Sequence, residues 1–120
     1  MLRLRYQTDD IQKTLFCLGI TRRYIGYRYA EEALLLLRDD ENRIYSVTKC
    51  LYPVIARKYT TSVNAVERDI RTLSLVAWRS RRQTLEEMAG HPLEHRPTSS
   101  HFLAILYAHL LYGCTTSIMV

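Results

Sequence analysis

Residues 56–70, ARKYTTSVNAVERDI, have the spacing of a helix-turn-helix, and this segment constrains the fold more than any other. Ala56 is small enough to let two helices approach closely. Thr60 and Ser62 follow four and six residues later, where such a motif has its turn. Because this motif inserts its second helix into the major groove of DNA, the segment predicts a helix that is open to a nucleic acid. Many helical hairpins share parts of the pattern, so a hairpin without a DNA role stays open at this point.

The second helix of the motif has two separate faces. Apolar residues recur every three or four positions on one face, namely Val63, Val66, Ile70, Leu73 and Ala77. The polar face, centred roughly 140° away, comprises Asn64, Glu67, Arg68 and Arg71. Beyond these residues the polar face continues with Leu75 and Trp78. We therefore expect the back half of the helix to be buried on most sides and only its first two turns to be open to DNA.

Periodicity and capping residues predict an all-α six-helix bundle containing the helix-turn-helix, in one domain over residues 1–120 with a core at about 9–112. The helices are expected at about residues 9–18, 27–38, 47–59, 62–79, 84–89 and 99–112. Residues 39–43 read as a polar connector, and residues 113–120 as a frayed tail. Pro53 removes a backbone donor inside the third helix, so we expect a kink or a fresh helix start there.

Composition sets limits on compartment and partners. The net charge of +5 and the pI of about 9.3 fit a polyanionic partner without proving one. Cys17, Cys50 and Cys114 are widely spaced, which favours reduced core thiols over a disulfide framework. No signal peptide is apparent, and the apolar runs are far shorter than the roughly 20 residues that span a bilayer. We therefore expect a cytoplasmic protein without a membrane partner.

The polar face of the second helix carries the candidate base contacts. The forked guanidinium groups of Arg68 and Arg71 match the acceptors that guanine shows in the major groove, and Glu67 could accept a hydrogen bond from cytosine. The alternative is a solvated helix face, because Glu67 and Arg71 are four residues apart and can pair with each other. The turn upstream favours DNA contact over this alternative.

The candidate phosphate contacts surround this helix. Thr61 and Ser62 are at its N-terminus, where hydroxyls and backbone amides suit a phosphate, although a helix cap explains them equally well. Further basic side chains that could flank the DNA backbone are on the preceding helix and in loops: Lys49, Arg57, Lys58, Arg22, Arg23 and Arg96. For each of these, a solvated surface charge is an equally good reading.

Other chemistry has little support in the sequence. His91 and His95 are four residues apart, but Pro92 separates them and no third metal ligand is close in sequence. We expect no metal, no cofactor and no enzymatic activity, because no nucleophile–base arrangement or glycine-rich phosphate loop is present. The tyrosines at positions 24, 27 and 29 are expected to pack rather than to stack on bases.

Five segments give the chain a resemblance to a known family: GYRYAEEA (26–33), SVTKCLYPVIARKY (46–59), VERDIR (66–71), VAW (76–78) and RPTSSHF (96–102). Over roughly residues 11–111, the chain resembles the C-terminal effector domain of the master response regulator of sporulation initiation in Bacillus and Clostridium relatives. The resemblance implies a six-helix bundle that binds short DNA boxes, often in tandem.

The resemblance also implies roles for individual residues. It makes Glu67 and Arg68 a base-reading pair and Arg71 a further contact, while Asn64 stands where the family usually has serine. In the same way, it assigns backbone contacts to Lys58, Thr61 and Ser62 and a basic loop position to Arg96. Tandem boxes imply head-to-tail homodimers on DNA, for which the sixth helix is a candidate surface.

Three departures from the family pattern limit this transfer. Ala65 replaces a common basic residue, which should weaken phosphate affinity. Thr60 replaces an asparagine in the turn, and a β-branched residue adopts a positive φ less readily. Residues 79–84 also differ, in a region that in the family is near the surface touching RNA polymerase sigma factor, which leaves sigma-dependent activation open.

Only about ten residues precede the first helix, so we expect no receiver domain. The rival hypothesis is a free-standing protein-interaction module or competitor that has lost activation, with the DNA-facing surface reused or idle.

Overall fold

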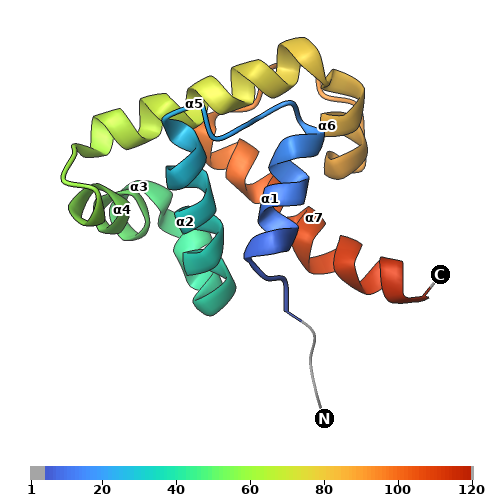
Figure 1. The fold of residues 1–120 in the computed structure, drawn as a ribbon, viewed down its shortest axis with the longest axis horizontal. Helices are drawn as coiled ribbons and strands as arrows, with labels where there is room; N and C mark the ends of the chain where they lie inside the picture. Colours follow the sequence, from blue (N-terminus) through green and yellow to red (C-terminus); the bar gives the residue numbers. More distant parts are fainter. Residues whose placement is uncertain (1–4, 120) are drawn as a thin grey trace.

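The computed structural model describes the backbone of residues 5–119 and the side chains of residues 5–112. In this part every regular element is a helix, which confirms the all-α prediction (Figure 1). The elements are α1 (Thr8–Cys17), α2 (Gly26–Asp39), the 3₁₀ helix η1 (Glu41–Ser46), α3 (Val47–Cys50), α4 (Tyr52–Lys58), α5 (Val63–Ser80), α6 (Arg82–Ala89) and α7 (Ser99–Met119). None of the described helices combines the length and the apolar character needed to cross a bilayer.

The predicted third helix is two helices in the structure. The chain leaves helical geometry at Leu51 (φ −120°, ψ −59°), and α4 begins one residue later with Pro53 in its first turn. Proline is tolerated there because the first amides of a helix have no intrahelical acceptor. The alternative of a fresh start at Pro53 is therefore the one that the structure adopts.

Three element boundaries differ from the sequence prediction. Residues 41–43 of the predicted connector belong to η1, which begins where the Asp40 carboxylate accepts a hydrogen bond from the Asn42 amide at 3.2 Å. Helix α6 begins at Arg82, two residues before the predicted start. Helix α7 continues to Met119 rather than ending at Tyr112. The prediction of a frayed tail concerns residues 113–120, whose side chains lie outside the described part of the chain.

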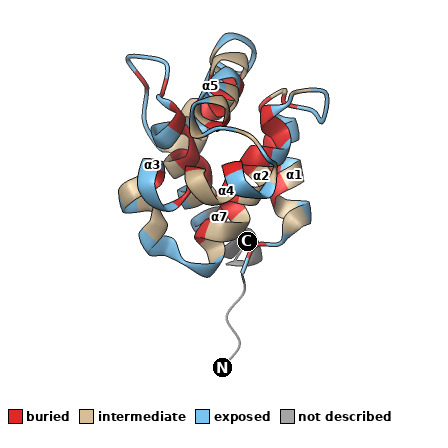
Figure 2. Cartoon of the chain, turned by 90° about the vertical axis from the view of Figure 1, so that its left-hand side faces the viewer, coloured by how far each residue is buried: buried red, intermediate tan, exposed pale blue. Residues whose placement is uncertain are grey.

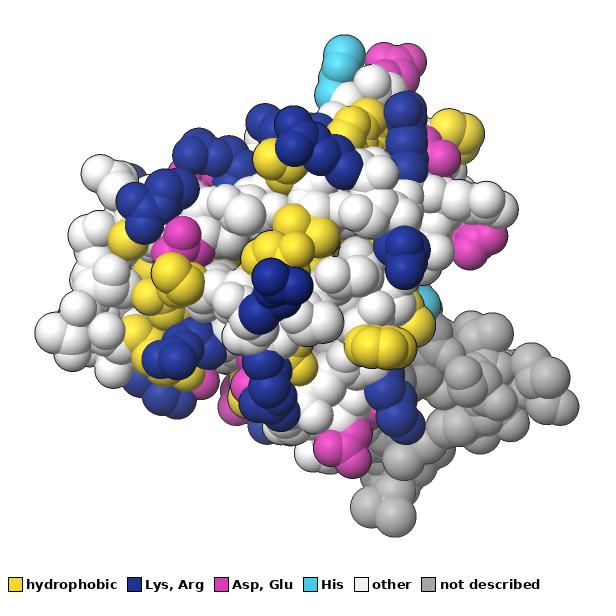
Figure 3. All heavy atoms as spheres, turned by 45° about the horizontal axis from the view of Figure 1, so that its top comes forward, with side chains coloured by type: hydrophobic (Ala, Val, Ile, Leu, Met, Phe, Trp, Pro, Cys, Tyr) yellow, Lys and Arg dark blue, Asp and Glu magenta, His cyan; other side chains and the backbone are white. Residues whose placement is uncertain are grey.

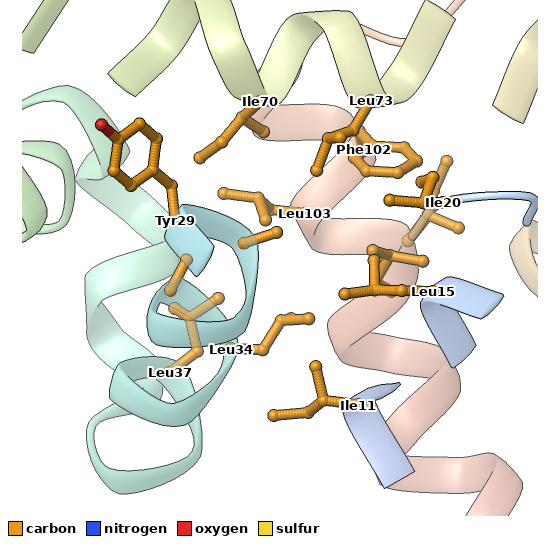
Figure 4. Packing of buried hydrophobic residues seen from close by; sticks show 14 of the residues in the cluster. Ile11, Leu15, Ile20, Tyr29, Leu34, Leu37, Ile70, Leu73, Phe102 and Leu103 are labelled. Carbon is orange, nitrogen blue, oxygen red and sulfur yellow. The ribbon is translucent and has the colours of Figure 1, made fainter. Parts of the chain in front are cut away.

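The core forms where α1, α2, α5 and α7 converge (Figure 4). Each helix contributes large apolar side chains that are fully buried, among them Ile11, Leu15, Leu34, Leu37, Ile70, Leu73, Phe102 and Leu103. Helix α5 lies across one end of α2, and the buried residues of both helices face the interior (Figure 2). The predicted apolar face of α5 is therefore the face that attaches it to the bundle.

Gly26 sets how closely α2 approaches α5. A Cβ atom at this position would lie 2.3 Å from the backbone oxygen of Asp69 and 3.2 Å from Cγ of Leu73. Only a residue without a side chain allows this contact, so Gly26 fixes the distance between the first turn of α2 and the middle of α5.

Two buried polar contacts attach α4 and α5 to the α7 region. The Ser74 hydroxyl donates to the Pro97 carbonyl oxygen at 2.8 Å. The Tyr52 hydroxyl donates to Oγ of Ser99 at 2.7 Å. Burial raises the pKa of Tyr52 to about 12, although the Ser99 hydrogen bond opposes this shift. Because buried polar groups are costly without partners, these pairs favour one arrangement of the helices.

The prediction of core thiols is wrong for two of the cysteines. Cys17 and Cys50 carry free thiols and are exposed. Cys17 lies off the stripe of α1 that faces the core, and α3 is a single turn in which only Val47 is buried. Cys114 lies outside the described side chains. The tyrosines behave as predicted: Tyr27 and Tyr29 are buried, and Tyr24 packs against the core.

Candidate nucleic-acid interface

Helices α4 and α5 form the helix-turn-helix, and the turn between them has two local anchors. The Thr61 amide donates to the Ala56 carbonyl oxygen at 2.9 Å, which closes the end of α4 over the buried Ala56. The Ser62 hydroxyl oxygen accepts from the Ala65 amide at 3.0 Å and caps α5. Thr60, which directly precedes these two residues in the turn, has a φ of 53°. It therefore adopts the left-handed conformation that a β-branched residue disfavours.

Helix α5 separates its faces as the sequence predicts. Val66, Ile70, Leu73 and Ala77 are completely buried, while Val63 at the first turn is half-buried. On the opposite side, the side chain of Arg68 is 61% exposed and that of Arg71 is 49% exposed. Asn64 is also exposed, and Glu67 is half-buried. The first two turns of α5 thus present a polar surface whose back is anchored in the core.

Both arginines of this surface contact carboxylates of α5. Arg68 Nε donates to Asp69 Oδ1 at 3.2 Å. Arg71 Nη1 is 3.1 Å from Glu67 Oε1, the i,i+4 pair that the alternative reading of the sequence anticipates. An exposed i,i+4 pair contributes roughly 0.3–0.5 kcal/mol, so the pair with Glu67 holds Arg71 only weakly.

The candidate phosphate contacts lie around the ends and sides of α5. Lys58, at the end of α4, contacts Glu32 of α2, with Nζ and Oε1 2.7 Å apart, and this hydrogen bond raises the pKa of Lys58. Lys49 is exposed on α3. Thr61 is half-buried, and Ser62 already acts as the cap. The sequence did not indicate the Lys58–Glu32 pair, because it depends on how α2 packs against α4.

Arg96 is exposed in the loop between α6 and α7. Its neighbour Pro97 accepts the Ser74 hydrogen bond, so this loop is attached to the side of α5. The structure thus brings Arg96 close to the same helix as the other candidates.

The back half of α5 is covered except at its end. Leu75 and Trp78 are half-buried, and Arg79 and the last residue of α5 are exposed. The guanidinium carbon of Arg82 lies 3.9 Å from the centre of the Trp78 ring, so an α6 arginine covers a tryptophan that also packs against the core. The prediction of burial on most sides therefore holds for residues 73–78, which are all buried or half-buried, but not for the last two residues of the helix.

The outer face around α5 is rich in basic side chains. Figure 3 shows Lys and Arg side chains spread across this face, with apolar groups between them and fewer acidic ones. Among the described residues, no three His, Cys, Asp or Glu side chains come together as a metal site would require.

Comparison with known protein families connects this architecture to a family. A family model described as "Sporulation initiation factor Spo0A C terminal" matches residues 11–110. The chain belongs to this family. Membership places it among the DNA-binding effector domains of sporulation initiation and confirms the resemblance drawn from the five segments. The matched residues include α4, the turn and all of α5.

Proposed function

We propose that this protein is a sequence-specific regulator of transcription that reads double-stranded DNA by inserting the first two turns of α5 into the major groove. The single observation that supports this most strongly is the division of α5, whose inner face (Val66, Ile70, Leu73 and Ala77) is fully buried while Arg68 remains largely exposed. A recognition helix needs this combination, because its position must be fixed while its outer residues reach the bases.

In this proposal, α5 makes direct contact with base edges. Arg68 and Arg71 offer guanidinium forks to guanine, Glu67 accepts from cytosine, and Asn64 is available to adenine. All four come from the exposed side of one helix, so they would meet successive base pairs along one groove. Each well-formed arginine–guanine contact contributes about 1–3 kcal/mol of discrimination.

Phosphate contacts would set the register of the helix in the groove. The start of α5 supplies Thr61 and Ser62, and the neighbouring elements supply Lys58, Lys49 and Arg96. The Ser62 hydroxyl oxygen accepts the cap hydrogen bond, which leaves its O–H and the backbone amide as the donors offered to phosphate at the helix N-terminus. With this role we propose a cytoplasmic protein without catalytic activity.

We also propose head-to-tail homodimers on tandem sites, and RNA polymerase sigma factor as a partner. The exposed arginines at residues 79–82 would then determine whether the sigma contact forms, since they occupy the region that departs from the family pattern.

A second function is favoured by one group of observations. Thr60 adopts a strained left-handed conformation, Ala65 offers no charge, and Lys58 and Arg71 are in ion pairs. These features would fit a protein-interaction module or competitor whose DNA affinity is reduced. Such a module would bind duplex DNA weakly and without preference for sequence.

One binding experiment separates the two functions. Duplexes are enriched from a random-sequence pool on the immobilised protein, and the winning duplex is compared with a scrambled version by fluorescence anisotropy at fixed salt. We expect at least a 10³-fold preference, the lower end for specific DNA-binding proteins. Failure to enrich any sequence, or equal affinities for both duplexes, would reject sequence-specific reading and favour the interaction module.

A further inference from the structure

The loop between α1 and α2 lies along one flank of α5 (Figure 1). At one end of this loop, a Cβ atom on Gly19 would lie 3.7 Å from Cγ of Arg81, just beyond the end of α5. At the other end, Gly26 contacts the backbone of Asp69 near the middle of α5. Residues 19–26 therefore run beside the helix over about three of its turns.

This loop carries two adjacent exposed arginines. Arg22 and Arg23 both face solvent, and the Arg22 guanidinium carbon is 5.4 Å from the ring centre of Tyr27. Among the described residues, no carboxylate forms a salt bridge with either arginine. Two positive charges thus remain uncompensated beside α5, in a loop whose two ends are fixed by packing.

The loop between α6 and α7 lies on the opposite flank. It is attached through the hydrogen bond from Ser74 to Pro97, and it presents the exposed Arg96. No salt bridge within the described part of the chain neutralises Arg96 either.

Helical geometry shows that the exposed stripe of α5 is between these two flanks. At about 100° per residue, Asp69 and Ser80, which contact the first loop, are about 20° apart around the axis. Ser74, which contacts the second loop, is about 140° from Asp69 on the same scale. The solvent-exposed stripe containing Arg68 and Arg79 occupies the remaining arc.

We infer that Arg22 and Arg23 on one side and Arg96 on the other form a two-sided clamp for the phosphates that border the groove occupied by α5. This inference rests on the proposed function. A helix about 10–12 Å in diameter fills a major groove about 12 Å wide. The two loops flank α5 from Asp69 onward, behind the turns that enter the groove, so their arginines would reach the bordering phosphates where the helix leaves the groove. The ligand is the phosphodiester backbone of duplex DNA, so the clamp contributes affinity without sequence preference.

The test compares charge-neutralising variants on the enriched duplex and on its scrambled version. The double variant R22Q/R23Q removes the first side of the clamp, and R96Q removes the second. K13Q is the matched control, because Lys13 lies on α1 and belongs to neither loop. Thermal unfolding followed by circular dichroism confirms that each variant keeps the fold. Affinity is then measured over a range of salt concentrations, and ethylation interference locates the phosphates that matter.

The clamp predicts that the slope of log affinity against log salt becomes shallower by about 0.9 for each lost contact. The change is therefore about 1.8 for R22Q/R23Q and about 0.9 for R96Q, with none for K13Q. Interference is lost at one border of the groove in R22Q/R23Q and at the other in R96Q. Unchanged slopes, or loss at the same phosphates in both variants, would overturn the clamp.

The two proposals fail in different ways. If the wild-type protein prefers the enriched duplex but R22Q/R23Q keeps its full salt slope, only the clamp is rejected. If no duplex is preferred but R22Q/R23Q flattens the slope on all of them, the clamp stands and sequence-specific reading is rejected.

Discussion

Replacing Gly26 with alanine tests whether the contact between α2 and α5 positions the DNA-facing helix. The added Cβ would lie 2.3 Å from the Asp69 backbone oxygen, so the two helices must separate by about 1 Å before ordinary contact at 3.4 Å is reached. Backbone atoms form this contact on the α5 side, so no side-chain rotation can relieve it. The change therefore displaces α5 as a whole or breaks its packing against α2.

The magnitude follows from two opposing terms. Overpacking a well-packed site costs typically about 1–3 kcal/mol, and a backbone contact belongs at the upper end of that range. Alanine in place of glycine returns less than about 1 kcal/mol in helix propensity, because Gly26 is the first residue of α2. We expect Gly26→Ala to lower the free energy of unfolding by about 2 kcal/mol, which corresponds to a fall in Tm of roughly 6–10 °C.

Urea unfolding followed by circular dichroism measures this change, with Gly90→Ala as the control. Gly90 ends α6 with a φ of 85°, and a Cβ atom added there would meet no other atom within 4 Å. Its substitution therefore costs only about 1 kcal/mol of backbone strain. Because α5 must move in Gly26→Ala, the folded variant should also lose affinity for the enriched duplex, whereas Gly90→Ala should not. A Gly26→Ala protein with wild-type stability would refute the account of how α5 is positioned.

Four further changes give measurable outcomes. Arg68→Ala should cost about 1–3 kcal/mol of binding to the enriched duplex and relax specificity at one base pair; an equal loss on scrambled DNA in anisotropy titrations would contradict base reading. Lys58→Ala should weaken binding to every duplex and reduce the salt slope by about 1; an unchanged slope would mean that Glu32 retains this lysine. Thr60→Gly should raise the free energy of unfolding by about 1 kcal/mol in urea titrations, because glycine adopts a φ of 53° without the Cβ penalty; a lowered midpoint would exclude strain at this turn. Burial raises the pKa of Tyr52 to about 12, so the unfolded chain loses this proton first and stability should fall as pH rises from 10 towards 12, by up to about 1.4 kcal/mol per pH unit. Tyr52→Phe should reduce that fall in stability. If the variant and the wild-type protein show the same pH profile, Tyr52 is not the group responsible.

The sequence predicted those features of the fold that depend on short-range patterns. The repeat of Val66, Ile70 and Leu73 identified the buried face of α5, and Ser62 marked its start, because periodicity and capping are local properties. Pro53 likewise marked a helix start, since proline restricts its own backbone and removes its own amide.

Features that depend on contacts between distant segments were not predicted. Gly26 is in a segment that carried the resemblance, but its role depends on Asp69, more than forty positions later. The contact of Trp78 with Arg82 of the next helix was likewise not indicated by the sequence. The exposed position of Cys17 could not be read from its residue type, because cysteine is usually buried.

The ion pairs on α5 are compatible with a DNA-reading helix. Breaking the exposed Glu67–Arg71 pair costs roughly 0.3–0.5 kcal/mol, and a bidentate contact with guanine returns about 1–3 kcal/mol. The Arg68–Asp69 contact uses Nε of Arg68. The two terminal amino groups, which form the fork, therefore remain outside this pair. Since the Asp69 side chain is only 15% exposed and its backbone lies against Gly26 of α2, it can orient the guanidinium before DNA arrives. Orientation in advance lowers the entropy lost on binding, so this pair favours base reading rather than opposing it.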